Sequence, residues 1–119
     1  MRIGEVARGA GVSTRALRYY EEQGLLVARR SSGGQRSYDE AAIGRVRLIQ
    51  QLFAAGLPSR TLLEMLPCVD SGRATPEVLR MLTGERERIV GAIADMQSAL
   101  RQLDRVIDIA HDRDPCQEL

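Results

Sequence analysis

The stretch from Thr75 to Ala110 constrains the fold most, because nothing in it stops a helix. Thr75 can cap the helix start, Pro76 suits the first helical position, and Glu77 places a carboxylate in the first turn. A helix over this stretch has roughly 35 residues and a length of about 50 Å. A small domain cannot enclose such a helix. The sequence therefore predicts a mainly α fold in which one long helix is appended to a small head.

Apolar residues recur along this helix in alternating steps of three and four, which is typical of a coiled coil. Gly84 and Gly91 each weaken the helix interior by about 1 kcal/mol relative to Ala, so the helix needs a partner. We expect a second copy of the chain, in a homodimer; the alternative is a helix folded back on its own head. The repeat consists of Leu79, Leu82, Arg86, Ile89, Ile93, Met96, Leu100, Leu103, Ile107 and Ala110. The predicted dimer contacts are Leu82, Ile89, Ile93, Met96, Leu100, Leu103 and Ile107.

Near the N-terminus, two short amphipathic segments are joined by a tight turn. Residues 3–10 form the first and residues 13–24 the second, with Gly11 between them. Ser13 can cap the second helix, and Gly24 can end it in a left-handed conformation. This arrangement predicts a helix-turn-helix, whose second helix enters the major groove of DNA. Glycine-linked helix pairs are also common in all-α proteins without that function.

Residues 25–38 predict a β-hairpin with a Ser-Ser-Gly-Gly tip. Arg29 and Arg30 lie on one arm and Arg36 lies on the other. In a DNA-binding head such a hairpin is a wing that contacts phosphates beside the recognition helix. The alternative is a solvated surface turn.

Two further helices complete the predicted head. Asp39 can cap a helix that runs to Gly56. Another helix follows Pro58, with Ser59 as its cap or its first residue, and is stopped by Pro67. The predicted domains are the winged helix-turn-helix head over residues 1–67, a hinge over 68–75, the dimerisation helix over 76–110 and a flexible tail over 111–119.

Charge is divided unevenly along the chain. Residues 1–60 contain 10 arginines and 5 acidic residues, a balance of +5, whereas residues 61–119 contain 7 arginines and 11 acidic residues, a balance of −4. The first half is therefore predicted to face a polyanion.

Other functional classes lack the motifs they require. The sequence has no phosphate-binding glycine loop, no nucleophile elbow and no helical metal-ligand motif, and it has one histidine. We therefore predict a protein that is not an enzyme and holds no metal or cofactor. Because no signal-peptide-like run and no membrane-length apolar segment occurs, we expect a cytoplasmic protein without membrane partners.

Five stretches of the chain match one known pattern. They are Ile3-Gly4-Glu5-Val6-Ala7, Gly11-Val12-Ser13-Thr14-Arg15-Ala16-Leu17-Arg18-Tyr19-Tyr20-Glu21, Gly24-Leu25-Leu26, Gly34-Gln35-Arg36-Ser37-Tyr38-Asp39 and Ala55-Gly56-Leu57. With the long helix, they resemble a MerR-family transcriptional regulator over nearly the whole chain. The Leu-Arg-Tyr-Tyr-Glu string followed by Gly-Leu-Leu is far more specific than a generic helix-turn-helix.

The resemblance implies a homodimer, paired through an antiparallel coiled coil, that binds a two-fold symmetric operator in double-stranded promoter DNA. It also implies that the protein bends and untwists this DNA so that RNA polymerase can engage the promoter. Gln35 stands where the family usually has Tyr, and Tyr20 is equally a candidate for the head core. The implied DNA contacts are Thr14, Arg15, Arg18, Tyr19, Tyr20, Arg30, Gln35, Arg36 and Arg60.

The cysteines depart from the metal-sensing and iron-sulfur members of the family. Thr75 stands where metal sensors have their first thiol, and the tail offers only Cys116. Cys68 lies in the predicted hinge, where a covalent change could alter the angle between the DNA-binding heads. It is predicted to be either a thiol sensor or a buried structural thiol. The remaining alternatives for the protein are a dimeric coiled-coil adaptor and an architectural DNA-binding protein without an inducer.

Overall fold

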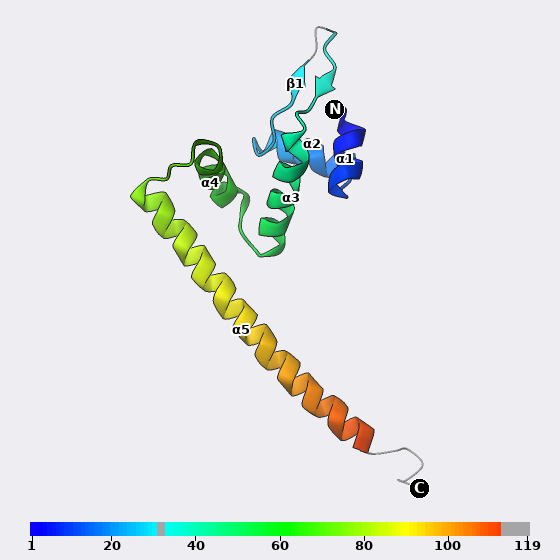
Figure 1. Ribbon diagram of the computed structural model, residues 1–119, viewed down its shortest axis with the longest axis vertical. Coiled ribbons are helices and arrows are strands. Elements are labelled where there is room, and N and C mark those ends of the chain that lie inside the picture. The colour runs from blue at the N-terminus through cyan, green and yellow to red at the C-terminus, as the bar shows by residue number, and fades with distance from the viewer. Residues whose placement is uncertain (31–32, 113–119) are drawn as a thin grey trace. The chain divides into compact units, whose positions relative to one another are not determined.

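The computed structural model describes residues 1–30 and 33–112. In this part of the chain five helices accompany one two-stranded antiparallel sheet (Figure 1). The elements are α1 (Ile3–Ala10), α2 (Thr14–Glu22), β1 (Arg29–Arg30), β2 (Arg36–Ser37), α3 (Ala41–Ala54), α4 (Ser59–Ser71) and α5 (Pro76–Asp112). The predicted mainly α fold with a small hairpin and a long C-terminal helix is confirmed. The chain divides into two units, Met1–Leu79 and Arg80–Leu119, of which we call the first the head.

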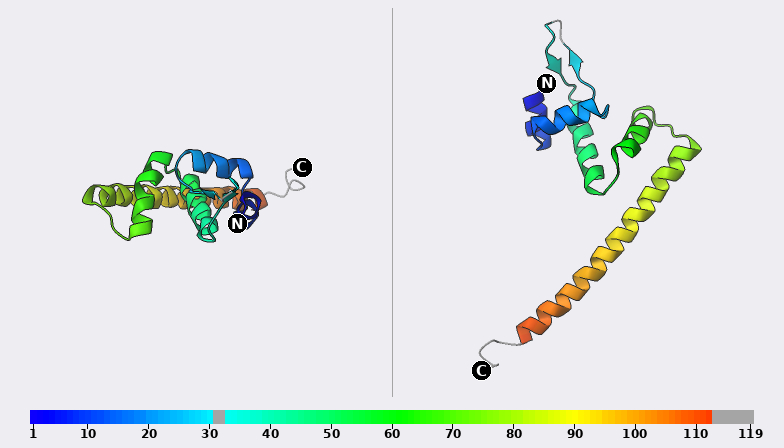
Figure 2. Two further views of the ribbon diagram at one scale, coloured as in Figure 1. Left: turned by 90° about the horizontal axis from the view of Figure 1, so that it is seen from above. Right: turned by 180° about the vertical axis from the view of Figure 1, so that it is seen from behind.

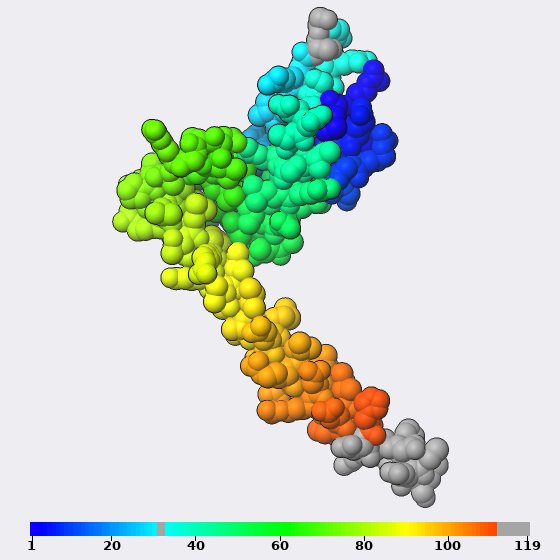
Figure 3. Space-filling model, viewed as in Figure 1, coloured from blue at the N-terminus to red at the C-terminus, as the bar shows by residue number. Residues whose placement is uncertain are grey.

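The core of the head forms where α1, α2, α3 and α4 meet. Its completely buried side chains are Val6, Leu17, Val46, Ile49 and Leu62. α1 and α3 approach closely at Gly9, where a Cβ atom would lie 2.6 Å from Cδ1 of Ile43. Arg47 spans the same contact, since its Nη2 donates to the carbonyl of Gly9 at 2.8 Å. The surfaces of α1 and α3 accordingly meet without a gap in Figure 3.

The turn between α1 and α2 contains the predicted glycine. Gly11 has a φ of 71°, in the left-handed region that favours glycine, and the N–H of Val12 donates to the carbonyl of Ala7 at 3.0 Å. Ser13 caps α2, because its Oγ accepts a hydrogen bond from the N–H of Ala16 at 3.1 Å. The predicted helix-turn-helix is therefore confirmed. Both views in Figure 2 show α1 and α2 lying against α3.

The predicted hairpin is confirmed over its described residues. Arg29 pairs with Ser37 and Arg30 pairs with Arg36, while residues 31 and 32 of the predicted tip lie outside the described residues. The start of the chain is joined to the base of the hairpin. The N–H of Tyr38 donates to the carbonyl of Met1 at 2.6 Å, and the ammonium of Met1 donates to the carbonyl of Tyr38 at 2.7 Å.

The prediction that Pro67 stops α4 is wrong, because the helix continues to Ser71. A proline inside a helix removes one hydrogen bond and destabilises the helix by about 3 kcal/mol. Burial of Met65 and Leu66 holds the turn before it. The turn after it is held by an ion pair from Asp70 to Arg45 of α3. The first four residues of the predicted hinge therefore belong to α4.

The prediction that Asp39 caps α3 is also wrong. The N-cap residue is Glu40, whose backbone is already helical and whose side chain makes no capping hydrogen bond. The N–H of Ala42 instead donates to the backbone carbonyl of Asp39 at 3.0 Å. The carboxylate of Asp39 lies 3.8 Å from the guanidinium of Arg29, so it is turned toward the hairpin.

α5 is one continuous helix (Figure 1). Its predicted cap is confirmed, because Oγ1 of Thr75 accepts a hydrogen bond from the N–H of Val78 at 3.2 Å. The helix runs two residues past the predicted end, and residues 113–119, with Cys116, lie outside the described residues. The second half of the apolar repeat is exposed: Met96 is 72% accessible and Leu100 is 57% accessible. No described helix is long and apolar enough to cross a membrane.

Candidate nucleic-acid interface

α2 presents a polar surface to solvent. Arg15 and Arg18 are exposed, Tyr19 is 48% accessible, and Thr14 is half-buried. Leu17 anchors the opposite side of the helix in the core. The helical periodicity therefore brings the four predicted side chains Thr14, Arg15, Arg18 and Tyr19 to the accessible side of α2.

Tyr20 belongs to the core rather than to this surface. It is buried, and its ring centroid lies 5.8 Å from that of Phe53 in α3. Burial raises the pKa of its hydroxyl above the ordinary value, and the neighbouring Tyr19 raises the pKa further. Tyr20 thus positions α2 on α3, and we leave it out of the proposed contact surface.

The wing carries the remaining predicted cations. Arg30 is exposed, and so is Arg29, which is paired with Asp39. Gln35 is exposed at the start of the returning arm, where its Oε1 accepts a hydrogen bond from Nη2 of Arg2 at 3.4 Å. Arg36 differs from these residues, because it is half-buried and turned toward α2.

An ionic junction joins the wing to α2. Glu21 of α2 places its Oε2 3.5 Å from Nη1 of Arg36, and the hydroxyl of Tyr38 donates to the same oxygen at 3.1 Å. Arg18, Glu21, Glu22 and Arg36 line a small groove of about 160 Å³ at this junction. Glu21 of α2 therefore pairs with Arg36, one of the predicted contacts on the wing.

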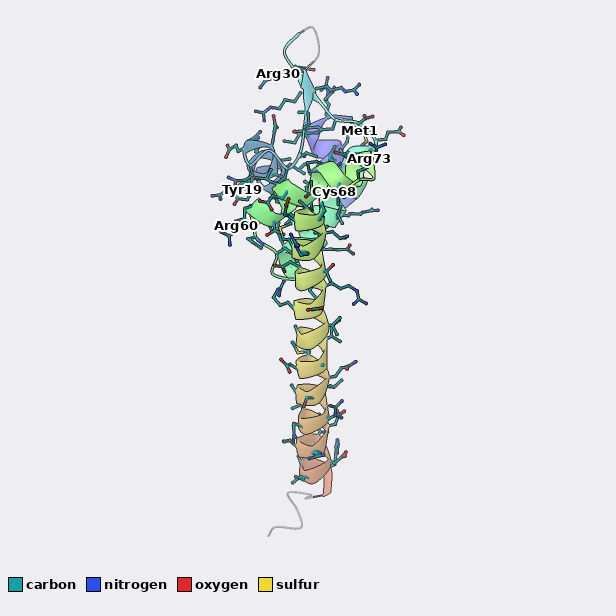
Figure 4. All side chains as sticks on the ribbon, turned by 90° about the vertical axis from the view of Figure 1, so that its left-hand side faces the viewer. Met1, Tyr19, Arg30, Arg60, Cys68 and Arg73 are labelled. Atoms are coloured by element: carbon teal, nitrogen blue, oxygen red, sulfur yellow. The ribbon has the colours of Figure 1, made fainter. Side chains whose placement is uncertain are left out.

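Arg60 lies at the start of α4 and is exposed. In Figure 4 Arg60 and Tyr19 project on the same side of the head, and Arg30 lies above them on the wing. Arg73 projects on the opposite side. Three elements of the head thus contribute exposed predicted contacts to one side.

This side of the head has the chemistry of a nucleic-acid interface. Guanidinium groups on a helix can bind the O6 and N7 atoms of guanine in the major groove, and those on a wing can bind phosphates. An exposed tyrosine adds a hydroxyl for the phosphate backbone. The structure therefore places groups that can read bases and groups that can bind phosphates on neighbouring elements.

Cys68 lies in the body of α4 and not in a linker. It is half-buried, and its Sγ lies 3.9 Å from the carbonyl of Glu64, one turn earlier. In the described ranges no group of three His, Cys, Asp or Glu side chains could hold a metal ion.

Sequence reasoning missed the roles of Glu21, Tyr38 and Arg2. One signal was available: Arg36 and Tyr38 are two residues apart on an extended arm, so their side chains point to the same face. Glu21 lies one turn after Arg18 on α2. No local pattern shows that this face of α2 meets Arg36 and Tyr38, because the first arm and the tip of the hairpin lie between them in the sequence.

Comparison with known proteins assigns the head to a described family. Residues 1–67 match the family model described as MerR HTH family regulatory protein. This stretch is more than half of the chain and contains α1 to α3 and most of α4.

Two curated relatives and one solved structure extend the similarity beyond the head. The HTH-type transcriptional regulator ZntR of Escherichia coli (strain K12) is 32% identical over 110 residues, covering 90% of this chain and 78% of ZntR. Nodulation protein NolA of Bradyrhizobium sp. (strain NC92) is 35% identical over 103 residues, which span 86% of this chain but only 42% of NolA. The crystal structure of a MerR-family regulator from Listeria monocytogenes superposes with a TM-score of 0.82 at 31% identity, covering 99% of this chain and 92% of that one.

Proposed function

The chain belongs to the MerR HTH family of regulatory proteins, and on this basis we propose that it controls transcription by binding promoter DNA as a homodimer. The observation that carries the proposal is the exposed arginine pair on α2, Arg15 and Arg18, in a confirmed helix-turn-helix beside the wing. α2 lies in the major groove, where these two side chains read bases. Arg30, Arg36, Gln35 and Arg60 bind the phosphate backbone.

The proposed homodimer forms through α5. An exposed apolar stripe of this length needs a cover, and the repeat complements itself when two copies run antiparallel. In that register Ile93 of one copy faces Met96 of the other. Arg86 also favours the antiparallel arrangement. In a parallel pair the two Arg86 guanidinium groups would face and repel each other. In the antiparallel pair Arg86 faces Leu103 and lies beside Asp104, whose charge is opposite.

The dimer gives a mechanism for regulation. Two heads held by one coiled coil fix the distance between the two half-sites that they can occupy. Binding both half-sites then requires the DNA between them to bend or untwist, and the deformed duplex presents the promoter to RNA polymerase in an altered geometry. A sensing role for Cys68 stays a prediction. The residue itself lies one turn before the end of α4.

The test measures DNA affinity as a function of salt for the wild type, Arg18→Ala and Arg73→Ala. The probe is a duplex from the promoter region upstream of the protein's own gene. We expect Arg18→Ala to weaken binding by about 1–3 kcal/mol and to relax base preference, because it removes a base contact. Arg73→Ala removes an exposed arginine on the opposite side of the head and should have little effect.

Equal affinity for wild type and Arg18→Ala would contradict the assignment of α2 as the recognition helix. Salt also separates the proposal from the adaptor alternative. A DNA-binding head loses affinity steeply as salt rises, because phosphate contacts release counterions, and an adaptor has no such dependence.

A further inference from the structure

We propose that Glu21 is a specificity-determining positioning residue, which fixes Arg36 of the wing beside the recognition helix so that the two elements read DNA as one unit. This inference rests on the proposed function, because it concerns how the same DNA surface tells one sequence from another. Glu21 acts through Arg36 and is not itself a DNA contact.

The carboxylate of Glu21 is held by a buried donor. The side chain of Glu21 is 22% accessible, and its Oε2 accepts the hydroxyl hydrogen of Tyr38. Tyr38 is 3% accessible, and its backbone is bonded in both directions to Met1. The hydroxyl therefore has a fixed place in the head. A carboxylate bonded to it has a fixed place as well, and so has the Arg36 guanidinium 3.5 Å away.

The junction needs an acid because two cations meet there. Arg18 of α2 and Arg36 of the wing line the same small groove, where like charges would push the wing away from the helix. Arg36 and the Tyr38 hydroxyl meet at the same oxygen of Glu21. Burial raises the pKa of that hydroxyl, and the charges of Arg36 and Arg18 act in the opposite direction. The strands of the wing have two residues each and supply few hydrogen bonds of their own. The Glu21 carboxylate replaces this repulsion with attraction.

An acid in a DNA-binding surface also lowers DNA affinity, and this loss can help the protein to distinguish one DNA sequence from another. Its charge repels phosphates and lowers affinity for every duplex by a similar amount. Arg36 offsets this loss only where a phosphate lies at the right distance from the bases that α2 reads. Specificity is a difference of affinities and is raised by penalties on wrong partners as much as by contacts with the right one.

The experiment uses three variants of the full chain. Glu21→Gln removes the charge and keeps the shape. Glu22→Gln is the matched control, because it removes the same charge from the neighbouring residue in the same groove, outside the ion pair. Tyr38→Phe removes only the buried hydroxyl, which has no access to DNA and carries no charge near neutral pH. The probes are a duplex that the wild type selects from a randomised pool and a scrambled duplex of the same length.

We expect Glu21→Gln to bind the scrambled duplex more tightly and the selected duplex no more tightly, so that the ratio of the two affinities falls by about three- to tenfold. Glu22→Gln should tighten binding to both duplexes and keep the ratio. Tyr38→Phe should lower the ratio in the same direction as Glu21→Gln, although no charge has changed. Circular dichroism and the melting temperature of each variant confirm that the helices are intact.

Two results would overturn the inference, and they differ from failure of the proposed function. If Glu21→Gln keeps the affinity ratio as Glu22→Gln does, Glu21 acts only through its general negative charge and does not position Arg36. If Tyr38→Phe leaves the ratio unchanged, the anchored geometry does not matter. If the wild type selects no sequence from the pool, the proposed function fails and the inference falls with it.

Discussion

The pKa of the buried Tyr38 hydroxyl differs between the folded and the unfolded chain. Burial raises its pKa above the ordinary tyrosine value, and the hydrogen bond to Glu21 raises the pKa further. Arg36 and Arg18 act in the opposite direction by favouring the charged phenolate. The net shift is upward, so ionisation is harder in the folded chain than in the unfolded chain.

This shift predicts a loss of stability in alkali. A group whose pKa is raised by folding contributes stability below its unfolded pKa, about 10 for tyrosine, and loses this contribution as pH rises through the folded value. We expect the free energy of unfolding to fall as pH rises above about 10. In Tyr38→Phe the fall should be shallower, as measured by urea titration at a series of pH values. A fall of the same steepness in both proteins would show that the Tyr38 hydroxyl does not ionise with unfolding.

At the level of residues, prediction succeeded where a local pattern carries the information. Ser13 and Gly11 have short-range roles in a cap and a turn, and helical periodicity alone exposes Arg15 and Arg18. The role of Glu21 could not be predicted, because its partners Arg36 and Tyr38 are distant in sequence and are brought to it only by the fold of the hairpin. Tyr20 remained open because periodicity cannot decide whether a tyrosine that has both a ring and a hydroxyl packs inside or reaches out.

At the level of elements, α4 and α5 show opposite limits of helix prediction. Pro67 is a strong local stop signal, yet tertiary contacts on both sides of it carry α4 on to Ser71. α5 was predictable over nearly its full length, because a cap and a sustained repeat agree. Local rules therefore hold in α5, and packing against α3 overrides them in α4.

Three glycines offer a matched test of helix energetics. A Cβ atom at Gly72, Gly84 or Gly91 would meet nothing within 4 Å, so substitution changes only the backbone preference. Gly84→Ala and Gly91→Ala should each stabilise the chain by about 1 kcal/mol, because both lie inside α5. Gly72→Ala should destabilise it by about 1 kcal/mol or more, because Gly72 has a φ of 72°. Urea unfolding of the three variants measures these changes, and a uniform sign across them would contradict this account.

At the level of the whole molecule, the proposed antiparallel pairing of α5 predicts the effect of a charge at the centre of that pair. Ile93→Asp puts two carboxylates into the middle of an apolar seam, which should raise the dissociation constant of the dimer by at least about a hundredfold. Ser98→Asp is the control, because residue 98 lies on the outer side of the same heptad repeat. Sedimentation equilibrium measures both variants. An Ile93→Asp protein that remains dimeric would mean that the stripe packs on something else.

In the proposed homodimer, the exposed stripe of α5 also makes regulation depend on the number of protein molecules in a cell. A lone helix with two interior glycines is marginally stable, so its folding depends on meeting a second chain. When dimers are scarce, their concentration grows with the square of the chain concentration, and only a dimer grips both halves of an operator. Occupancy of the operator then rises steeply over a narrow range of copy number. In this proposal, a promoter that the protein controls switches over a narrow range of protein concentration, even before any inducer acts.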